Sequence, residues 1–263
     1  MPMQAEIGII GGTGVYDPQL LENVEEIKVH TPYGSPSDLI TVGELKGRKI
    51  AFVPRHGKKH TIRPTDINSR ANMYALKQLG VQRVLAPSAV GSLKEEFRPG
   101  DVVFIDQFID RTTRREQSFY TGPQVCHITV AEPMCPDLRK ILIKIAEDLD
   151  IRYHKTGTYI CIEGPRFSTK AESKLFRSWG ADVIGMTLVP ECVLAKEAEI
   201  CYASIATVTD YDVWKEHPVS TREIMKTMKE NMEKVKGLIT ETILKIPKER
   251  KCECATALKN ALI

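Results

Sequence analysis

Apolar runs alternate with amphipathic segments along this chain of 263 residues. Short continuous apolar runs are typical of buried strands, and apolar residues three and four positions apart are typical of helices that cover a sheet. A long, mostly apolar run over residues 200–208 therefore predicts a buried strand. The other predicted strands are residues 6–10, 39–42, 50–53, 83–86, 102–105, 158–162 and 183–185.

Helices are predicted between these strands. Asp66 is expected to cap a helix that ends before Gly80, because apolar residues recur on one face between them. Ser220 and Glu223 form a capping box that opens a long amphipathic helix reaching Ile243. Further helices are predicted at residues 137–149, 170–179 and 190–199.

The alternation of strands and helices continues without internal repeats or low-complexity linkers. This pattern predicts an α/β fold in which a single domain, residues 1–247, holds a mixed central sheet flanked by helices. Residues 248–263 are more charged and are expected to form a C-terminal tail.

Composition narrows the classes of function. The 37 basic and 34 acidic residues leave a net charge of only +3, and no basic block with interleaved aromatic residues occurs, so we expect no nucleic-acid partner. No apolar run approaches the roughly 18 residues that a membrane span needs, and no apolar leader is evident. We therefore expect a soluble, cytoplasmic protein with no membrane partner.

The seven cysteines do not resemble a secreted disulfide framework, because their number is odd and their spacing uneven. Five of them lie in or beside apolar stretches, where a free thiol behaves as a small hydrophobic group. Cys252 and Cys254 lie instead in the charged tail. No further ligand is near them in the sequence, so we expect a redox pair or a link to another chain rather than a metal site. Intracellular disulfides favour a hot-environment source.

Candidate chemistry is concentrated where predicted strands end. Asp210 and Asp212 follow the run at 200–208, and their spacing puts both carboxylates on one side of an extended chain. Ligands of α/β sheets bind beyond the carboxyl ends of the strands, which makes Asp210 a candidate catalytic acid. A turn with two solvated aspartates explains the spacing equally well.

Three other strand ends offer groups that bind anions. The glycines around Thr13 turn backbone amides outward, although Asp17 occupies the third glycine position of the dinucleotide fingerprint. Arg55 and His56 suit phosphate or sulfate. Ser88 and its neighbours offer a hydroxyl and free amides. Each of these segments is also compatible with a simple turn or a solvated loop.

Two more strand ends suggest a nucleoside. Phe167, in the loop before a predicted helix, is placed to stack on a flat base, although such a residue is more often part of a core. Thr187 offers a hydroxyl for phosphate, and Met186 an apolar side chain for a sugar. The combination of anion-binding, aromatic and acidic groups at several strand ends favours a nucleoside and phosphate as ligands.

Several motifs occur together in an order that resembles one family, the purine nucleoside phosphorylases of the trimeric type, and among them those acting on 5′-methylthioadenosine. The resemblance extends from Ile7 to about Ile243. The motifs are Gly-Ile-Ile-Gly-Gly-Thr-Gly at 8–14, Arg-His-Gly at 55–57, Asp-Gln-Phe-Ile-Asp-Arg-Thr-Thr at 106–113, Glu-Gly-Pro-Arg-Phe-Ser at 163–168 and Thr-Asp-Tyr-Asp-x-Trp-Lys-Glu-His at 209–217.

The resemblance implies phosphorolysis of 5′-methylthioadenosine to adenine and 5-methylthioribose 1-phosphate, with no metal or organic cofactor because phosphate is the nucleophile. It also implies a homotrimer or homohexamer in which His127 reaches a neighbouring subunit's site. The phosphate ligands it implies are Thr13, Arg55, His56, Ser88, Ala89 and Thr187. The nucleoside ligands it implies are Phe167, Ser168, Met186, Asp210, Asp212, His127 and Thr221, with Ala89 also beside the ribose.

In this interpretation Asp210 donates a proton or hydrogen bond to purine N7 as negative charge builds on the leaving base. A buried position at the end of an apolar strand would raise its pKa and favour that role. Related phosphorylases of inosine and guanosine typically carry Asn at this position, so an aspartate favours 6-aminopurines.

Some features leave alternatives open. Thr221 stands where relatives have valine in the methylthio pocket, so a broader purine nucleoside phosphorylase acting on adenosine, inosine or guanosine is the main alternative. A hydrolytic nucleosidase and a non-catalytic nucleotide-binding protein are the others. The chain ends before the pocket-capping segment of animal relatives. Its Cys252-Glu253-Cys254 tail resembles that of archaeal thermophilic members, which implies disulfides.

Overall fold

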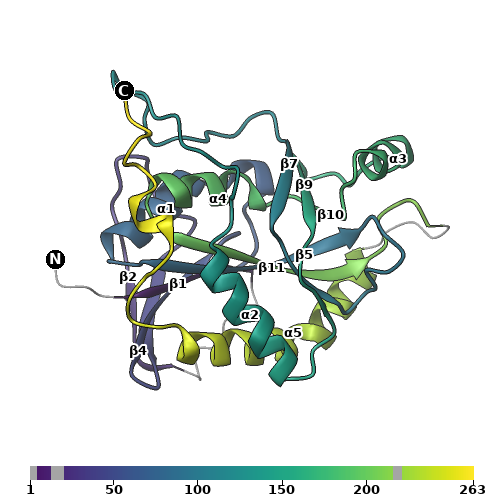
Figure 1. Cartoon of the computed structure of the whole chain (residues 1–263), viewed down its shortest axis with the longest axis horizontal. Helices are drawn as coiled ribbons and strands as arrows, with labels where there is room; N and C mark the ends of the chain where they lie inside the picture. Colours follow the sequence, from purple (N-terminus) through teal and green to yellow (C-terminus); the bar gives the residue numbers. More distant parts are fainter. Residues whose placement is uncertain (1–4, 13–20, 216–220) are drawn as a thin grey trace.

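A computed structural model describes residues 5–12, 21–215 and 221–263, except for the side chains of Thr221 and Glu223. A mixed sheet of eleven strands runs through the middle of this part, with helices on both of its faces (Figure 1). The predicted α/β fold with a mixed central sheet is thus confirmed.

The centre of the sheet is parallel. Strand β1 (Ile7–Gly11) lies between β4 (Arg48–Pro54) and β5 (Arg83–Ser92), and β11 (Cys201–Asp210) pairs with the other side of β5. These four strands point the same way, so their carboxyl ends lie at one edge of the sheet. The short strand β10 (Val183–Gly185) runs antiparallel to β5 at that edge. The remaining strands are β2 (Glu22–Ile27), β3 (Ile40–Leu45), β6 (Val102–Phe104), β7 (Gln107–Arg111), β8 (Tyr153–His154) and β9 (Thr158–Ile162).

Helices cover the two faces in pairs. Helices α1 and α4 contact each other on one face, and α2 and α5 contact each other on the opposite face (Figure 1). Strand β11 shows why the sheet needs both layers. Its Tyr202 and Ala206 belong to the core on the α1 side, and its Ala203 and Ile205 to the core on the α2 side. The helices are α1 (Ser69–Gln78), α2 (Pro136–Asp148), α3 (Lys170–Ser178), α4 (Leu188–Glu197) and α5 (Thr221–Lys245).

The start of the first helix was predicted wrongly. Asp66 does not cap α1 but closes a separate 3₁₀ helix, Pro64–Asp66. The cap is Asn68, whose Oδ1 accepts from Ala71 N at 3.1 Å. Both residues are common N-caps, and apolar spacing alone did not separate them. The predicted capping box at Ser220 lies outside the described residues.

Strand β5 is longer than the pattern predicted. It continues to Ser92, so Ser88 and Ala89 lie within the strand and not in a turn after it. Strands β2, β7 and β8 were not predicted. The reason is clear for β2, which is almost wholly exposed and carries three glutamates, so it lacks an apolar pattern.

The C-terminal tail lies against the rest of the protein. Arg83 Nη2 donates to Lys248 O at 3.1 Å, and Arg250 Nη1 donates to Glu199 O at 2.7 Å. Near its end the tail forms a bridge between Leu262 and Cys126. These contacts place the end of the tail beside the segment that contains His127.

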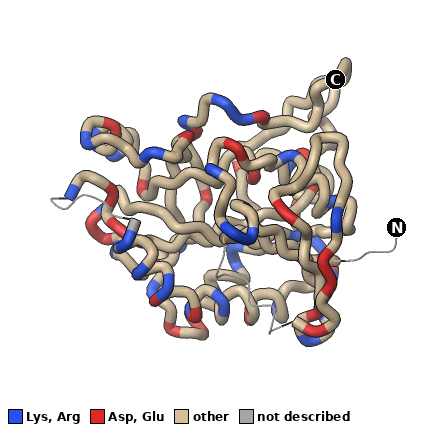
Figure 2. Tube along the Cα trace, turned by 180° about the vertical axis from the view of Figure 1, so that it is seen from behind, with Lys and Arg blue, Asp and Glu red and all other residues tan. Residues whose placement is uncertain are grey.

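Charges are distributed without an extreme pattern. Basic and acidic residues are interspersed along the chain (Figure 2). In the part of the chain that the structure describes, no helix is both long and apolar enough to cross a membrane.

Candidate active site

The predicted ligands gather at the edge where the parallel strands end. Arg55 N, just after β4, donates to Gly11 O at the end of β1 at 2.9 Å. In the antiparallel pair of β10 and β5, Ile184 lies opposite Gly91. Met186 and Thr187 follow directly after the end of β10. The sheet topology therefore converges on one site from four strand ends.

Arg55 holds this edge together. Its side chain is buried and forms a two-pronged ion pair with Glu191 of α4, with distances of 2.6 Å from Nε to Oε1 and 3.0 Å from Nη2 to Oε2. The guanidinium also donates to Pro87 O at 3.0 Å and to Ile10 O at 2.9 Å. Among the described residues, these contacts use four of the five N–H groups of an arginine and leave one on Nη1.

Glu191 is a positioning residue that sequence reasoning missed. It is 2% exposed, and Tyr202 donates its hydroxyl to Glu191 Oε2 at 2.9 Å. Burial opposes the charge of Arg55, but the carboxylate of Glu191 outweighs that effect and raises the pKa of the guanidinium. The available signal was an acid in an otherwise apolar stretch, which implies a buried partner.

His56 adds an acceptor next to this donor. Its Nδ1 lies 2.9 Å from Ile62 O, and a carbonyl can only accept, so Nδ1 carries the proton. Burial, together with a smaller effect of the positive charge of Arg55, outweighs the hydrogen bond to Ile62 O and lowers the pKa of His56 to about 4. The ring is therefore neutral at pH 7, with Nε2 as a hydrogen-bond acceptor.

The acid pair lies at the end of β11. Thr209 Oγ1 donates to Asp210 Oδ1 at 2.7 Å, and Asp212 N donates to Asp210 Oδ2 at 2.9 Å. Asp212 is 4% exposed, so a turn with two solvated aspartates does not describe it. Ser168 Oγ lies 2.7 and 2.8 Å from its two carboxylate oxygens.

Backbone geometry makes room for these carboxylates. Asp212 has a φ of +49°, so the extended geometry assumed for the pair ends at Asp210. Asp210 lies opposite Gly91 of β5, and a Cβ at Gly91 would lie 3.1 Å from Asp210 Oδ2. A side chain at Gly91 would therefore crowd the candidate acid.

A second ion pair fixes the loop that carries Phe167. Arg115 Nε pairs with Glu163 Oε1 at 3.1 Å, and Arg115 Nη1 donates to Met186 O at 2.7 Å. Burial opposes the charge of Glu163, but donors led by the backbone of Thr113 outweigh it and lower its pKa to about 2. Arg115 thus ties the end of β10 to the loop, while Phe167 is left 42% exposed.

Three other predicted ligands are not seen in this cluster, two of them because they are not described. Thr13 and the side chain of Thr221 lie outside the described residues. His127 is exposed, and its backbone N donates to Ala261 O in the C-terminal tail at 2.7 Å. Figure 1 shows the C-terminus on the opposite side of the molecule from the carboxyl end of β11. The structure does not bring His127 to the site of its own chain.

A hollow of about 780 Å³ lies beside the acid pair but does not contain the predicted ligands. Val213 and Trp214 form part of its wall, and Trp214 Nε1 donates to Ser92 O at 2.7 Å. The candidate site is therefore the edge where the predicted ligands lie, and not this hollow. The basic residues that line the hollow are Lys94, Lys170, Lys174, Arg177 and Lys215.

Fold and site define a nucleoside-phosphorylase type of protein, and comparison with known proteins agrees. Residues 6–244 match the family model described as the phosphorylase superfamily, so the chain belongs to that family.

Individual relatives narrow the comparison. The chain is 60% identical to S-methyl-5′-thioadenosine phosphorylase of Nitrosopumilus maritimus, over 99% of both chains. Among solved structures, a methylthioadenosine phosphorylase from an antarctic soil metagenomic library superposes with a TM-score of 0.94, at 44% identity over 99% of this chain and 93% of that one. A second solved structure is a mutant of the adenosine/methylthioadenosine phosphorylase of Schistosoma mansoni in complex with methylthioadenosine. It superposes with a TM-score of 0.91, at 39% identity over 97% of this chain and 96% of that one.

We predict that Glu191→Gln destabilises the protein, because it leaves the buried charge of Arg55 without a counter-charge. The free energy of unfolding should fall by about 3 kcal/mol, as measured by urea denaturation. The matched control is Glu230→Gln, which removes an exposed carboxylate 3.9 Å from Lys226 and should change stability by less than ~0.5 kcal/mol. Equal effects of the two substitutions would refute the role of Glu191.

We also predict that His56 makes stability depend on pH. Its pKa is about 4 in the folded protein and 6.5 in the reference state, so only the unfolded chain takes up this proton between those values. Stability due to the neutral ring is fully present above pH 6.5 and is lost as pH falls toward 4, by about 2 kcal/mol at pH 5. His56→Asn keeps a donor for Ile62 O, so its unfolding free energy in phosphate-free buffer should fall by that much less between pH 7.5 and 5. Parallel curves for the two proteins would contradict the assignment.

Proposed function

We propose that this protein catalyses the phosphorolysis of 5′-methylthioadenosine, a pentosyl transfer that yields adenine and 5-methylthioribose 1-phosphate. The carrying observation is the convergence of anion-binding groups and a pair of aspartates, one of them buried, at one sheet edge, in a member of the phosphorylase superfamily. The curated relatives with which it shares 54–60% identity are named as S-methyl-5′-thioadenosine phosphorylases.

For the phosphate we propose a subsite built around Arg55. Its remaining Nη1 hydrogen can donate to a phosphate oxygen, and neutral His56 can accept from the P–OH group of monohydrogen phosphate. Phosphate held below the sugar stabilises the positive charge that develops as the glycosidic bond breaks. The full set of proposed phosphate ligands is Thr13, Arg55, His56, Ser88, Ala89 and Thr187.

For the purine we propose that Asp210 faces N7 and Asp212 faces the 6-amino group. As the bond breaks, the base gains negative charge, and a proton or hydrogen bond from Asp210 stabilises it. The exposed ring of Phe167 is available for stacking, and Met186 is proposed to lie along the ribose. The reaction needs no cofactor, because the phosphate oxygen is the nucleophile and the adenine the leaving group.

The hydrogen bond from Ser168 bears on the choice of purine. Because Ser168 donates to Asp212, the carboxylate is held as an acceptor, which suits a 6-amino donor. A 6-oxo group would face that carboxylate acceptor to acceptor. Adenosine remains the main alternative substrate, since Thr221 would add polarity to the methylthio pocket and the Schistosoma mansoni relative is named for both adenosine and methylthioadenosine.

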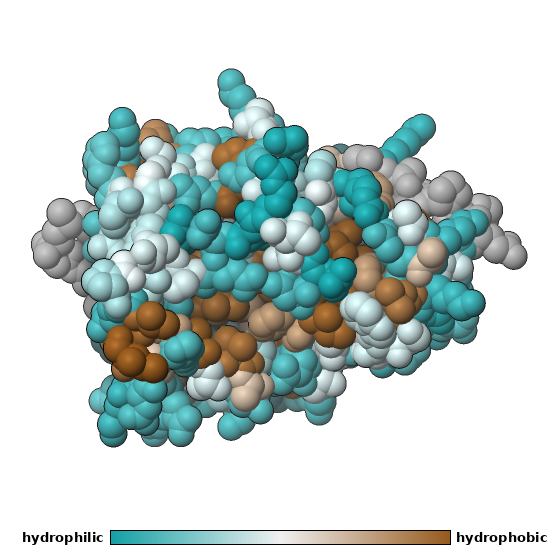
Figure 3. Space-filling model, turned by 90° about the horizontal axis from the view of Figure 1, so that it is seen from above, coloured by the Kyte–Doolittle hydropathy of each residue, from teal (hydrophilic) through white to brown (hydrophobic). Residues whose placement is uncertain are grey.

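We further propose a homotrimer or homohexamer in which His127 completes a neighbour's site. In the single chain His127 is exposed, and so are the large apolar side chains of Val125, Leu262 and Ile263 beside it. Figure 3 shows apolar side chains gathered on one part of the face seen from above. Exposed apolar groups next to a polar ligand are typical of an interface that also contributes to a site. We propose a cytoplasmic location, where free thiols such as these persist.

A base-release assay tests the function. 5′-Methylthioadenosine, adenosine and inosine are each incubated with the protein, with and without phosphate. Adenine release from methylthioadenosine that requires phosphate and exceeds release from inosine is the expected result. Release without phosphate would indicate a hydrolase, and equal rates on inosine a broader phosphorylase. Binding of adenosine without any release would indicate a non-catalytic protein.

We predict that Asp210→Asn lowers kcat for methylthioadenosine by about 100-fold, because it removes the acid that stabilises the leaving base. The KM for phosphate should change little, since the phosphate ligands are other residues. The rate on inosine relative to methylthioadenosine should rise, because an amide can donate to a 6-oxopurine. The control is Asp150→Asn, an exposed residue whose φ of +51° suits asparagine. Unchanged turnover in Asp210→Asn would exclude the proposed role.

A further inference from the structure

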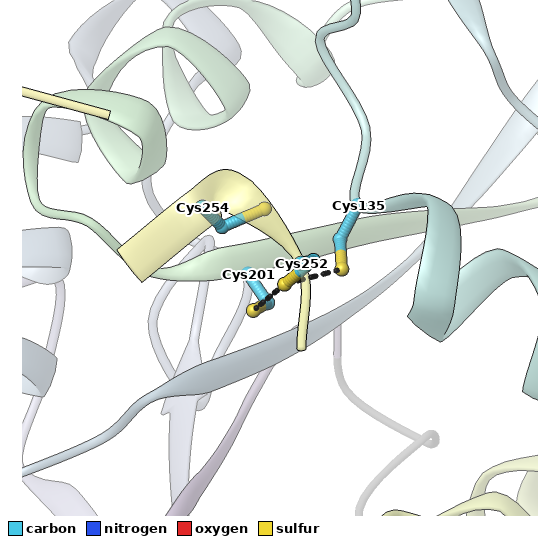
Figure 4. Close-up of side chains that lie close together, drawn as sticks. All are labelled: Cys135, Cys201, Cys252 and Cys254. Carbon is cyan, nitrogen blue, oxygen red and sulfur yellow. Dashed lines mark hydrogen bonds between the residues drawn. The ribbon is translucent and has the colours of Figure 1, made fainter. Parts of the chain in front are cut away.

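Four cysteines from three separate parts of the chain lie together where the C-terminal tail contacts the sheet. Their Sγ atoms all lie within 4.8 Å of one another. Cys135 precedes α2, Cys201 begins β11, and Cys252 and Cys254 lie at the 3₁₀ helix Glu253–Thr256 (Figure 4). The sequence-based expectation that the tail cysteines have no further ligand nearby is therefore wrong.

The spacing of these sulfurs suits a metal ion better than a covalent bond. Cys252 Sγ lies 3.6 Å from Cys135 Sγ and 3.3 Å from Cys201 Sγ. A disulfide needs about 2.05 Å, whereas a tetrahedral zinc ion with Zn–S bonds of about 2.3 Å separates its sulfurs by roughly 3.8 Å. All seven cysteines, including these four, are free in the structure.

The protein holds the cluster in a closed, nearly preformed arrangement. Cys135 N donates to Tyr202 O at 2.8 Å, and Cys201 N donates to Gln82 O at 3.0 Å, so two ligands are fixed by the sheet. Cys135, Cys201 and Cys254 are buried, and Cys252 is half-buried. A closed site with four thiols and no open position is typical of structural zinc.

The surroundings also suit the charge of such a site. A zinc ion with four thiolates carries a net charge of about −2. Arg83 lies directly beside Cys201 in the pairing of β5 and β11, which places a guanidinium where it can offset that charge.

We propose that Cys135, Cys201, Cys252 and Cys254 bind one structural zinc ion that fastens the C-terminal tail to the sheet. Each thiol loses a proton as its sulfur binds the metal, and no electron is transferred. Disulfide formation, which the resemblance of the tail to archaeal members implies, would instead require an oxidant and would remove the same sulfurs as ligands. The two states are therefore mutually exclusive. The zinc site is independent of the proposed phosphorolysis.

Metal content and thiol content distinguish these states. The full chain is purified under reducing conditions without chelator, and zinc is measured by elemental analysis and native mass spectrometry. We expect about one zinc per chain and, after denaturation with EDTA, all seven thiols. Zinc well below one per chain would overturn the proposal, and so would three titratable thiols, because two disulfides consume four of the seven.

Variants place the ion in the cluster. Cys254→Ser should lose the zinc and lower the melting temperature, and Cys126→Ser, a half-buried cysteine outside the cluster, should keep both. Replacing zinc with cobalt should give the visible absorption of a tetrahedral thiolate site in the wild type and in Cys126→Ser only. Zinc retained by Cys254→Ser, or lost from Cys126→Ser, would contradict the assignment. Phosphorolysis failing in any of these proteins would not bear on it.

Discussion

The buried ion pair between Arg55 and Glu191 is the constraint on which the candidate site depends. Removing two charges from water costs several kcal/mol per ion, so the pair persists only because each partner also has other hydrogen bonds in the interior. The carboxylate of Glu191 accepts hydrogen bonds from Arg55 and Tyr202, and Arg55 also donates to the carbonyls of Ile10 and Pro87. Helix α4, the end of β1 and the middle of β5 are thereby locked to the residue that follows β4. An anion that enters would meet a donor already oriented, because the guanidinium has no freedom to reorganise.

The apolar pattern predicted those elements whose residues are nearly all buried. Strand β11 was clear because nine of its ten residues are buried. Strand β2 was missed because it is an exposed edge rich in glutamate, where pairing with β3 and not apolar burial makes it a strand. The end of β5 was misjudged because Ser88, Ala89 and Gly91 are typical of turns. In the structure a glycine is needed at position 91, since Asp210 and Ile184 crowd it.

The candidate site was predictable only where one residue carries the chemistry. Strand ends directed attention to Arg55, His56 and Asp210, since ligands bind there in α/β sheets. Positioning residues left a weaker signal, because their partners are remote in sequence. Glu191 lies 136 residues from Arg55. The cysteine cluster shows the same limit: Cys252 meets partners 51 and 117 residues away, so local spacing could not reveal it.

The C-terminal tail connects the cysteine cluster with the segment that contains His127. Beyond the cysteine cluster it runs to Ile263, which exchanges hydrogen bonds with Val125 in both directions at 3.3 and 3.0 Å, and Ala261 O accepts from His127 N. The position of His127 thus rests on the tail, and the position of the tail rests on what holds Cys252 and Cys254. His127 is exposed and the structure does not bring it to the site of its own chain, so its proposed contribution is to the site of another chain. A metal that fastens the tail would then act on the proposed assembly through the position of His127, whereas the Arg55–Glu191 pair acts within one chain.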